Sequence, residues 1–313
     1  MKHLLRSAAG FLLLGSAAYG QLILGDDYNV AGSGTGFVLG SGVNSGINPP
    51  TTRMTGSAAA NMRYILPEAT KPAANYSIAT NAVQVAAASG SGRFTFSNDG
   101  TTAFDFGSLL GTGLATPANP VVYDVTLSLA NYTGTGNQNR FSFALATAEN
   151  NANFWDFGIQ LYRSGNNTTR YTIGKRIDRV SYTTATDSTG STDDKNAAIT
   201  TLGANTFGTT LDFLMRVTDA GAEATTFNSR VQLSMDGGST WFYDTQTDTD
   251  LTATGFRFDT TSRYFSFDIA GSTIASYDNF SLTLVTAAVP EPSTLSLSLV
   301  AAFGALAWRR RQK

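Results

Sequence analysis

Apolar and polar residues alternate with a period of two along much of this chain, which is the pattern of strands with one buried face. The apolar positions of the clearest segments are Val125-Leu127-Leu129, Phe141-Phe143-Leu145, Phe157-Ile159-Leu161, Leu211-Phe213-Met215-Val217, Val231-Leu233-Met235, Phe265-Phe267-Ile269 and Phe280-Leu282-Leu284. Segments of this kind predict about a dozen strands in antiparallel sheets that bury one side and expose the other.

Short segments rich in Gly, Asn, Thr and Ser separate these strands, as in Asp236-Gly237-Gly238. There, Gly237 or Gly238 is expected to supply the positive φ of a tight hairpin turn. Between Gln21 and Ala288 the sequence has no convincing apolar stripe at the helical period of 3.6 residues. The pattern predicts an all-β fold, an antiparallel two-sheet sandwich of jelly-roll type, whose first ~60 residues are loop-rich.

The first 20 residues have the order of a secretory signal peptide, with basic residues, then a short apolar run, then small residues. Ala18 and Gly20 occupy the small-residue positions before a predicted cleavage in front of Gln21. This order favours a signal helix over the alternative, an N-terminal helix buried in the fold. We therefore expect an exported protein whose mature body begins at Gln21.

Residues 289–313 form a tail with three parts in a fixed order. Pro290-Glu291-Pro292 comes first, an apolar segment over residues 295–308 follows, and Arg309-Arg310-Arg311 stands near the end. The apolar segment is shorter than the ~20 residues that span a bilayer comfortably, but it suits a thin membrane. The arginines would stay on the cytoplasmic side, which leaves the body outside, in agreement with the leader.

This three-part tail resembles the PEP-CTERM sorting signal. The resemblance implies recognition by an exosortase, a membrane protease, with cleavage near Pro290-Glu291-Pro292 and with Arg309, Arg310 and Arg311 as part of the signal. It also implies a Gram-negative-type bacterium that makes exopolysaccharide, transient anchoring in the inner membrane, and delivery to the outer surface or the extracellular matrix. An ordinary tail anchor is the alternative. Because the bodies of such proteins differ, the tail indicates a route and leaves the activity open.

The expected body, residues 21–288, resembles a laminin-G or concanavalin-like sandwich. Three pieces carry the resemblance: the segment around Phe154-Trp155-Asp156, the hairpin from Val231 to Trp241 with its Asp-Gly turn, and a closing strand from Tyr277 to Leu284. Fibronectin-like and other sandwiches contain similar hairpins. We expect one domain between the signal peptide of residues 1–20 and the sorting tail of residues 289–313.

Charge and composition exclude several classes of function. Without the two basic residues of the leader, and the four basic and one acidic residues of the tail, the body keeps 15 basic and 22 acidic residues. An acidic body without a basic stripe argues against nucleic-acid binding. The chain has no Cys, and its one His, His3, lies in the leader. Ser-His-Asp and Cys-His nucleophile systems, and zinc sites of the usual kind, are therefore excluded from the body.

Glycoside hydrolysis needs only two carboxylates, but the pattern for it is missing. The glucanases of the fold that the body resembles carry Glu-x-Asp-x-x-Glu on one strand. This body has only Glu68, Glu149 and Glu223, and none is followed by an acid two residues later. We therefore expect no enzymatic activity, and we rank a carboxylate-dependent glycosidase last among the functions considered.

Two groups of residues are candidates for ligand binding. Asp244, Asp248 and Asp250 gather carboxylates in a Thr-rich loop and are candidate calcium ligands. The spacing lacks the central Gly and final Glu of an EF-hand, and a solvated acidic loop is the favoured interpretation. Aromatic side chains near loops could stack on sugar rings, although packing in the sandwich interior is the simpler role for them. These are Trp155, Trp241, Tyr182 and Tyr243.

Two functional hypotheses survive. The first is a non-enzymatic surface or matrix protein that associates with exopolysaccharide after sorting. The second is a calcium-dependent, lectin-like module that binds glycans. Packed tryptophans on a flat sheet would favour the first hypothesis over the second.

Overall fold

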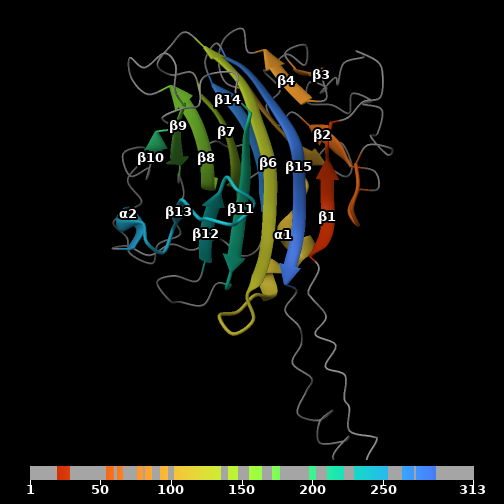
Figure 1. The fold of residues 1–313 in the computed structure, drawn as a ribbon. Coiled ribbons are helices and arrows are strands. Elements are labelled where there is room, and N and C mark those ends of the chain that lie inside the picture. The colour runs from red at the N-terminus through yellow and green to blue at the C-terminus, as the bar shows by residue number, and fades with distance from the viewer. Residues whose placement is uncertain are drawn as a thin grey trace, which may run out of the picture.

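The computed structural model of this chain describes residues 20–28, 54–59, 62–65, 76–79, 82–86, 92–97, 102–134, 140–146, 155–163, 171–176, 197–201, 210–221, 229–252, 263–270 and 273–286. These residues form two antiparallel sheets packed face to face, with two short helices and a 3-10 turn (Figure 1). The all-β two-sheet sandwich predicted from the alternation is confirmed.

The first sheet has eight strands in the order β13-β12-β11-β6-β15-β4-β3, with β1 paired to β15. Their bounds are β1 Gln21–Asp26, β3 Tyr76–Ala79, β4 Ala82–Ala86, β6 Val121–Gly134, β11 Leu211–Asp219, β12 Ser229–Ser234, β13 Tyr243–Asp244 and β15 Thr273–Thr286. The long strands β6 and β15 lie side by side through its centre (Figure 1).

The second sheet has seven strands in the order β10-β9-β8-β7-β14-β5-β2. Their bounds are β2 Arg63–Ile65, β5 Gly92–Ser97, β7 Arg140–Ala146, β8 Trp155–Arg163, β9 Tyr171–Arg176, β10 Ala197–Thr201 and β14 Tyr264–Ala270. Strands β7 to β10 form a meander, and the chain crosses between the sheets before β2, β3, β5, β6, β7, β11, β14 and β15. Meanders joined by such crossings give the two-sheet, jelly-roll type of arrangement that the sequence predicts.

Aromatic side chains fill the space between the sheets. Phe94 of β5 stacks on Phe267 of β14 with ring centroids 4.5 Å apart, and Phe280 of β15 lies 4.7 Å from Phe96. All four rings are buried. The apolar positions of the predicted alternation that belong to described side chains point into this core, apart from Met235 and Leu284, which are half-buried at its margin. Burial of this aromatic surface is the main stabilising contribution to the sandwich.

The two helices are short and were not predicted. Helix α1 covers Phe106–Leu110, a 3-10 turn η2 covers Thr112–Leu114, and helix α2 covers Thr249–Thr252. Each helix has about one turn, which is too short for a 3.6-residue stripe to be recognised in the sequence. Asp105 caps α1, because its carboxylate accepts a hydrogen bond from the Ser108 amide at 3.0 Å.

The first and last described strands are neighbours. Strand β1 pairs antiparallel with β15, so that Gln21 lies opposite Leu284 at one end of the sheet. The start of β6 lies at the same end, with Tyr123 opposite Leu284. Helix α1 and the loop into β6 are also found there (Figure 1). We call this end, formed by the start of β1, the end of β15, α1, η2 and the start of β6, the terminal pole.

Candidate functional site

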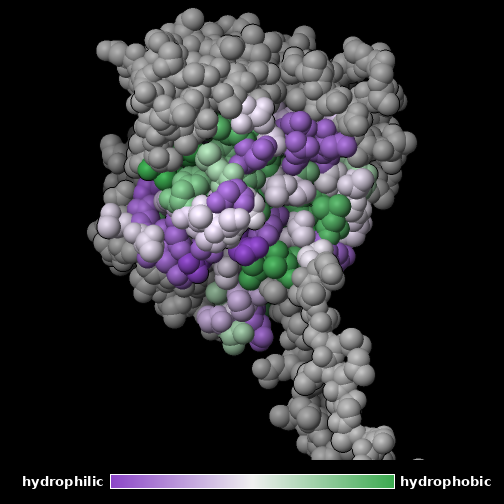
Figure 2. Space-filling model, viewed as in Figure 1, coloured by the Kyte–Doolittle hydropathy of each residue, from purple (hydrophilic) through white to green (hydrophobic). Residues whose placement is uncertain are grey.

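The eight-stranded sheet turns a polar face outward, opposite to the core. Alternate positions on its central strands carry hydroxyl, amide, carboxylate and guanidinium groups. These positions, called the outer face below, are Asp124, Thr126, Ser128, Asp212, Arg216, Arg230, Gln232, Asp244, Asp278 and Ser281. Figure 2 views the molecule from this side and shows hydrophilic residues interspersed with small apolar patches. A face of this composition can make many hydrogen bonds to a polar ligand.

A bidentate ion pair joins β6 and β11 on the outer face. The Arg216 guanidinium donates from Nε and Nη2 to the two carboxylate oxygens of Asp124, each at 2.8 Å. Hydrogen bonding to Asp124 raises the pKa of Arg216. The same guanidinium lies over the Trp241 ring, 5.3 Å from its centroid, in a cation–π contact. One arginine therefore orients both a carboxylate and a half-buried indole on the outer face.

The turn after β12 folds over the outer face and places Trp241. Gly237 and Gly238 have φ of 69° and 91°, so the predicted positive φ is present at both glycines. Leu214 points outward from β11, yet it is buried, because Gly238 approaches it so closely that a Cβ there would lie 3.1 Å from its side chain. Trp241 passes beside the same glycine. A larger residue at Gly238 would be strained by the positive φ and would press on the Leu214 side chain beside the indole.

Asp236 holds this turn together. Its carboxylate accepts hydrogen bonds from the Thr240 hydroxyl at 2.6 Å, the Thr240 amide at 2.8 Å and the Ser234 hydroxyl at 2.7 Å. These bonds to Thr240 and Ser234 lower the pKa of Asp236 to about 2. Because the charged form is the one that accepts them, the turn is firmest when Asp236 is ionised.

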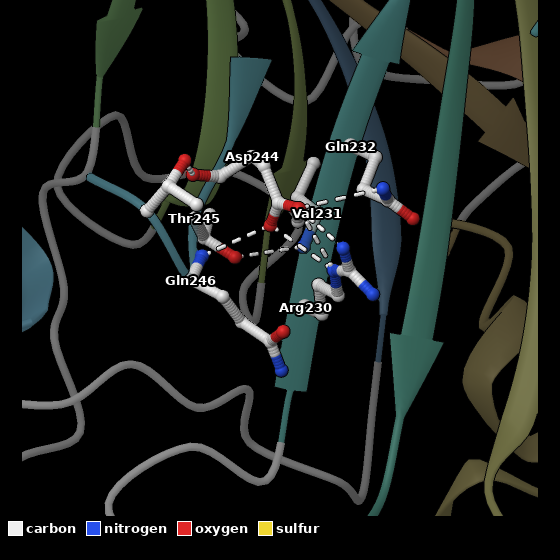
Figure 3. A network of polar contacts seen from close by, with 7 residues as sticks. Arg230, Val231, Gln232, Asp244, Thr245 and Gln246 are labelled. Carbon is white, nitrogen blue, oxygen red and sulfur yellow. Dashed lines mark hydrogen bonds and ion pairs between the residues drawn. The ribbon is translucent and has the colours of Figure 1, made fainter. Parts of the chain in front are cut away.

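A second polar network lies at the edge of the sheet, on β12 and β13 (Figure 3). The Arg230 Nε donates to both carboxylate oxygens of Asp244, at 3.0 and 3.1 Å, and its Nη2 forms an ion pair with the same carboxylate. Gln232 donates to Asp244 at 3.4 Å, and the Gln246 amide donates at 3.0 Å. Burial by itself would raise the pKa of Asp244, but these bonds and the Arg230 charge outweigh it and lower the pKa.

An irregular position in β15 adds polar groups at the centre of the outer face. Asn279 has a φ of 50°, and the pairing of β15 with β6 shifts register between Asp278 and Ser281. This bulge aims the Asn279 side chain at Ser128, whose hydroxyl it meets at 3.2 Å and which itself donates to Asp212 at 2.5 Å. Asparagine is one of the few non-glycine residues that adopt positive φ readily.

The four predicted stacking aromatics have different positions. Trp241 lies on the outer face as a half-buried ring, as described above. Tyr243 points inward, is 9% exposed and stacks on Phe157 with centroids 5.7 Å apart, so its ring serves the core. The side chain of Trp155 and all of Tyr182 lie outside the described residues. Only Trp241, of the aromatics that the structure describes in this set, is available to a ligand.

The three predicted calcium ligands do not converge in the described part of the chain. Asp244 is paired with Arg230, whereas Asp248 forms a nearly buried ion pair with Lys175 of β9 and accepts a hydrogen bond from the Tyr243 hydroxyl at 2.7 Å. The side chain of Asp250 lies outside the described residues. Over the described ranges, no three acidic side chains are grouped as a metal site would require. Calcium binding by Asp244, Asp248 and Asp250 stays a prediction.

The predicted sorting residues also lie beyond the last described strand. Pro290, Glu291, Pro292 and Arg309 to Arg311 follow Thr286, where the described chain ends. The predicted signal helix of the leader and the apolar segment of residues 295–308 lie outside the described residues too. None of the helices that the structure does describe has the length and apolar character to span a membrane.

Sequence reasoning missed the ion pairs that organise the outer face. Arg216 lies opposite Asp124 only because β11 pairs with β6, although strands β7 to β10 lie between them in the chain. Alternation places both residues on outward faces, but it does not state which strands are neighbours or in which register they pair. The opposite charges at outward positions were the available signal, and it is a weak one.

Comparison with known proteins identifies the tail and leaves the body less defined. No curated protein matches the chain significantly. Similar solved structures include an endo-1,3-beta-glucanase from Streptomyces sioyaensis, with 14% identity, coverage of 84% of this chain and 95% of that chain, and a TM-score of 0.44. The carbohydrate recognition domain of Emp47p is 12% identical, covers 71% of this chain and 87% of that one, and has a TM-score of 0.41.

An alginate lyase from Pseudomonas aeruginosa is similar at a lower level, with 7% identity, coverage of 67% of this chain and 85% of that chain, and a TM-score of 0.38. Residues 288–311 match the model of the PEP-CTERM protein-sorting motif. This match contains the predicted Pro-Glu-Pro element, apolar segment and arginines. The chain therefore carries a PEP-CTERM protein-sorting motif, which marks it as an exported protein that an exosortase processes.

Proposed function

We propose that this protein is a non-enzymatic component of the cell surface or extracellular matrix, and that the outer face of its sandwich associates with exopolysaccharide. The observation that carries the proposal is the combination of a sorting motif at residues 288–311 with a polar sheet face that holds a half-buried tryptophan. Hydroxyl-rich polymers are bound by such combinations, in which an aromatic ring packs on the ligand and nearby polar groups fix its orientation.

The outer face is ordered before any ligand arrives. Arg216 is held by Asp124, Asp244 is held by Arg230, and Ser128 is held between Asp212 and Asn279. Side chains fixed in this way lose little rotamer freedom when they bind a ligand. Each charged pair also keeps hydrogen-bonding capacity, since the carboxylate and guanidinium groups are only partly removed from solvent.

The proposal is tested with the full chain and exopolysaccharide purified from the bacterium that produces it. We expect the polysaccharide to retain the protein in affinity electrophoresis, both with calcium and with chelator. Trp241→Ala should weaken binding by roughly tenfold, the effect of removing an aromatic anchor worth ~1.4 kcal/mol. Leu109→Ala, a change at the terminal pole away from the outer face, is the matched control and should bind normally.

Three outcomes would count against the proposal in different ways. Absence of retention in both conditions would refute association with exopolysaccharide. Retention that chelator abolishes would favour the calcium-dependent, lectin-like alternative. If Trp241→Ala and Leu109→Ala weakened binding equally, the outer face would not be the surface that binds the polysaccharide.

A further inference from the structure

The terminal pole exposes leucines on a segment without charge. Leu114 is 83% exposed and Leu109 is 48% exposed, and with Leu22 they are the large hydrophobic residues exposed in the described part of the chain. From Phe106 to Tyr123 the sequence contains no charged residue. Large exposed leucines on an uncharged segment are unusual in a protein whose only environment is water.

This segment is held rigidly rather than fraying into solvent. Phe106 anchors α1 by stacking on Phe265, with ring centroids 4.1 Å apart and an interplanar angle of 9°. Thr112 is buried and donates a hydrogen bond from its hydroxyl to the Gly107 carbonyl at 3.1 Å. Gly221 lies so close to Ala115 that a Cβ there would be 1.9 Å from its carbonyl oxygen. Leu114 is therefore presented by a fixed backbone.

Charged side chains deep in the terminal pole are buried. Asp219, at the end of β11, lies opposite Val121, the first residue of β6, and pairs with Arg263 at 3.2 Å. Both side chains are 0% exposed. Asp105 is occupied in capping α1. These charged groups are therefore either buried in an ion pair or hydrogen-bonded as a helix cap. The surface around the leucines can enter an apolar environment at a low desolvation cost.

The tail brings this pole to a membrane. Strand β15 ends at Thr286 in the pole, and the apolar segment of the sorting tail begins at Leu295. The eight residues between them span at most ~30 Å when fully extended. A tether of that length keeps the pole beside the bilayer and gives it a high effective concentration there, so a weak apolar contact suffices.

We propose that the terminal pole is a membrane-docking face, which seats Leu109 and Leu114 in the lipid interface while the tail remains uncleaved. The proposal rests on the sorting tail, and it does not depend on polysaccharide binding by the outer face. Docking would fix the orientation of the body and hold the segment around Pro290 to Pro292 at the bilayer surface, where a membrane protease works.

The absence of cysteine in the chain makes the test direct. The full chain is reconstituted through its tail into vesicles of phosphatidylcholine and phosphatidylglycerol, with and without brominated acyl chains. A bimane label is placed at Leu114→Cys or, as the control, at Ser239→Cys in the exposed turn after β12. Ser234 pairs five residues from the pole end of β11, so that turn lies roughly 17 Å or more from the pole.

We expect brominated lipid to quench most of the fluorescence at position 114 and little at position 239. Adding Leu109→Asp to the Leu114→Cys chain should restore much of the fluorescence, while the chain still floats with the vesicles. Equal fluorescence loss at both positions, or none at 114 in a floating chain, would overturn the proposal. A chain that does not float would contradict both docking and the tail anchor. A dimer that Leu114→Asp dissociates, without lipid quenching, would reassign the face to self-association.

Discussion

Two arginine–aspartate pairs near the same end of the sandwich differ in geometry and in access to water. Arg216 and Asp124 make two hydrogen bonds of 2.8 Å on the outer face, with side chains 35% and 16% exposed. Arg263 and Asp219 are joined by one longer contact of 3.2 Å, yet both side chains are wholly buried. The pair with the better hydrogen-bond geometry is therefore the one that water can solvate. The pair with the poorer geometry is the one that water cannot reach.

This difference shows that the consequence of breaking a pair depends mainly on what replaces the lost partner. At the outer face water solvates a released charge, so the loss is small. In the interior water does not solvate the remaining ion, so the loss is larger. Asp219→Asn and Asp124→Asn test this contrast directly, and Asp278→Asn and Asp236→Asn extend it to a half-buried and an exposed carboxylate, in decreasing order of expected effect.

Asp219→Asn should cause the largest loss. It removes the carboxylate that pairs with the buried Arg263 guanidinium at 3.2 Å, and removing one partner of a buried pair typically costs about 3–5 kcal/mol. The free energy of unfolding, measured with urea, gives the loss directly. Asp212→Asn, at an exposed position of the same strand where the amide oxygen can still accept the Ser128 hydrogen bond, is the matched control and should change stability by less than about 0.5 kcal/mol. Equal effects of the two variants would contradict the role given to burial.

Asp124→Asn should have a smaller effect, about 0.2–1 kcal/mol, although it breaks the pair with the better geometry. Because exposed charges are screened by salt, the difference between the variant and the wild type should shrink at high ionic strength. Urea unfolding at low and high salt provides the measurement. A loss as large as that of Asp219→Asn, or one that salt leaves unchanged, would remove the contrast between the two pairs.

Asp278→Asn tests a half-buried carboxylate that faces other acids, and it should stabilise the fold at neutral pH. Burial raises the pKa of Asp278, and the charges of Asp27, Asp26 and Asp212 raise it further. The folded state thus binds the proton more tightly than the unfolded state, so ionisation of Asp278 lowers stability. The advantage of the variant should disappear as the pH falls below the ordinary value of 3.8, where both forms are neutral. If the variant were less stable at neutral pH, the hydrogen bonds of the Asp278 carboxylate would outweigh the cost of its burial and of the neighbouring negative charges.

Asp236→Asn should have the smallest effect and the clearest pH dependence. The pKa of Asp236 is lowered from 3.8 to about 2 by bonds to Thr240 and Ser234. A lowered carboxylate pKa contributes stability above the ordinary value, and this contribution is lost as the pH falls from about 4 to about 2. Thermal unfolding over this range should therefore show curves for wild type and variant that converge at the acid end. Parallel curves would mean that the charge of Asp236 does not hold the turn.

Alternation in the sequence was enough to predict the sandwich and the hairpin, because both depend on local pattern. The inward positions of β11, from Leu211 to Val217, and the two glycines of the turn after β12 are features of short segments. Period-two alternation reports burial of one strand face whatever the partner strand is. The sorting motif could also be recognised from local sequence, since its three parts follow one another within residues 288–311.

Features that join distant segments were not predictable in the same way. Lys175 and Asp248 form a nearly buried pair across 73 positions of sequence, and Arg263 and Asp219 do so across 44. A lysine on a strand ordinarily marks an exposed face, so Lys175 at 3% exposure contradicts the usual pattern. Tyr243 was predicted as a candidate for stacking on sugars because it lies near a loop, whereas packing against Phe157 places it in the core.

The pairing of β1 with β15 has a consequence for the order of events during secretion. A chain that crosses a membrane from its N-terminus delivers β1 first and β15 last, yet these strands are hydrogen-bonded neighbours. The edge of β1 stays open throughout translocation, and the eight-stranded sheet closes only when the last strand has emerged. Long-range pairing of this kind slows folding and leaves strand edges exposed meanwhile. A tail that halts in the membrane directly after β15 would hold the body in place while this final strand is inserted.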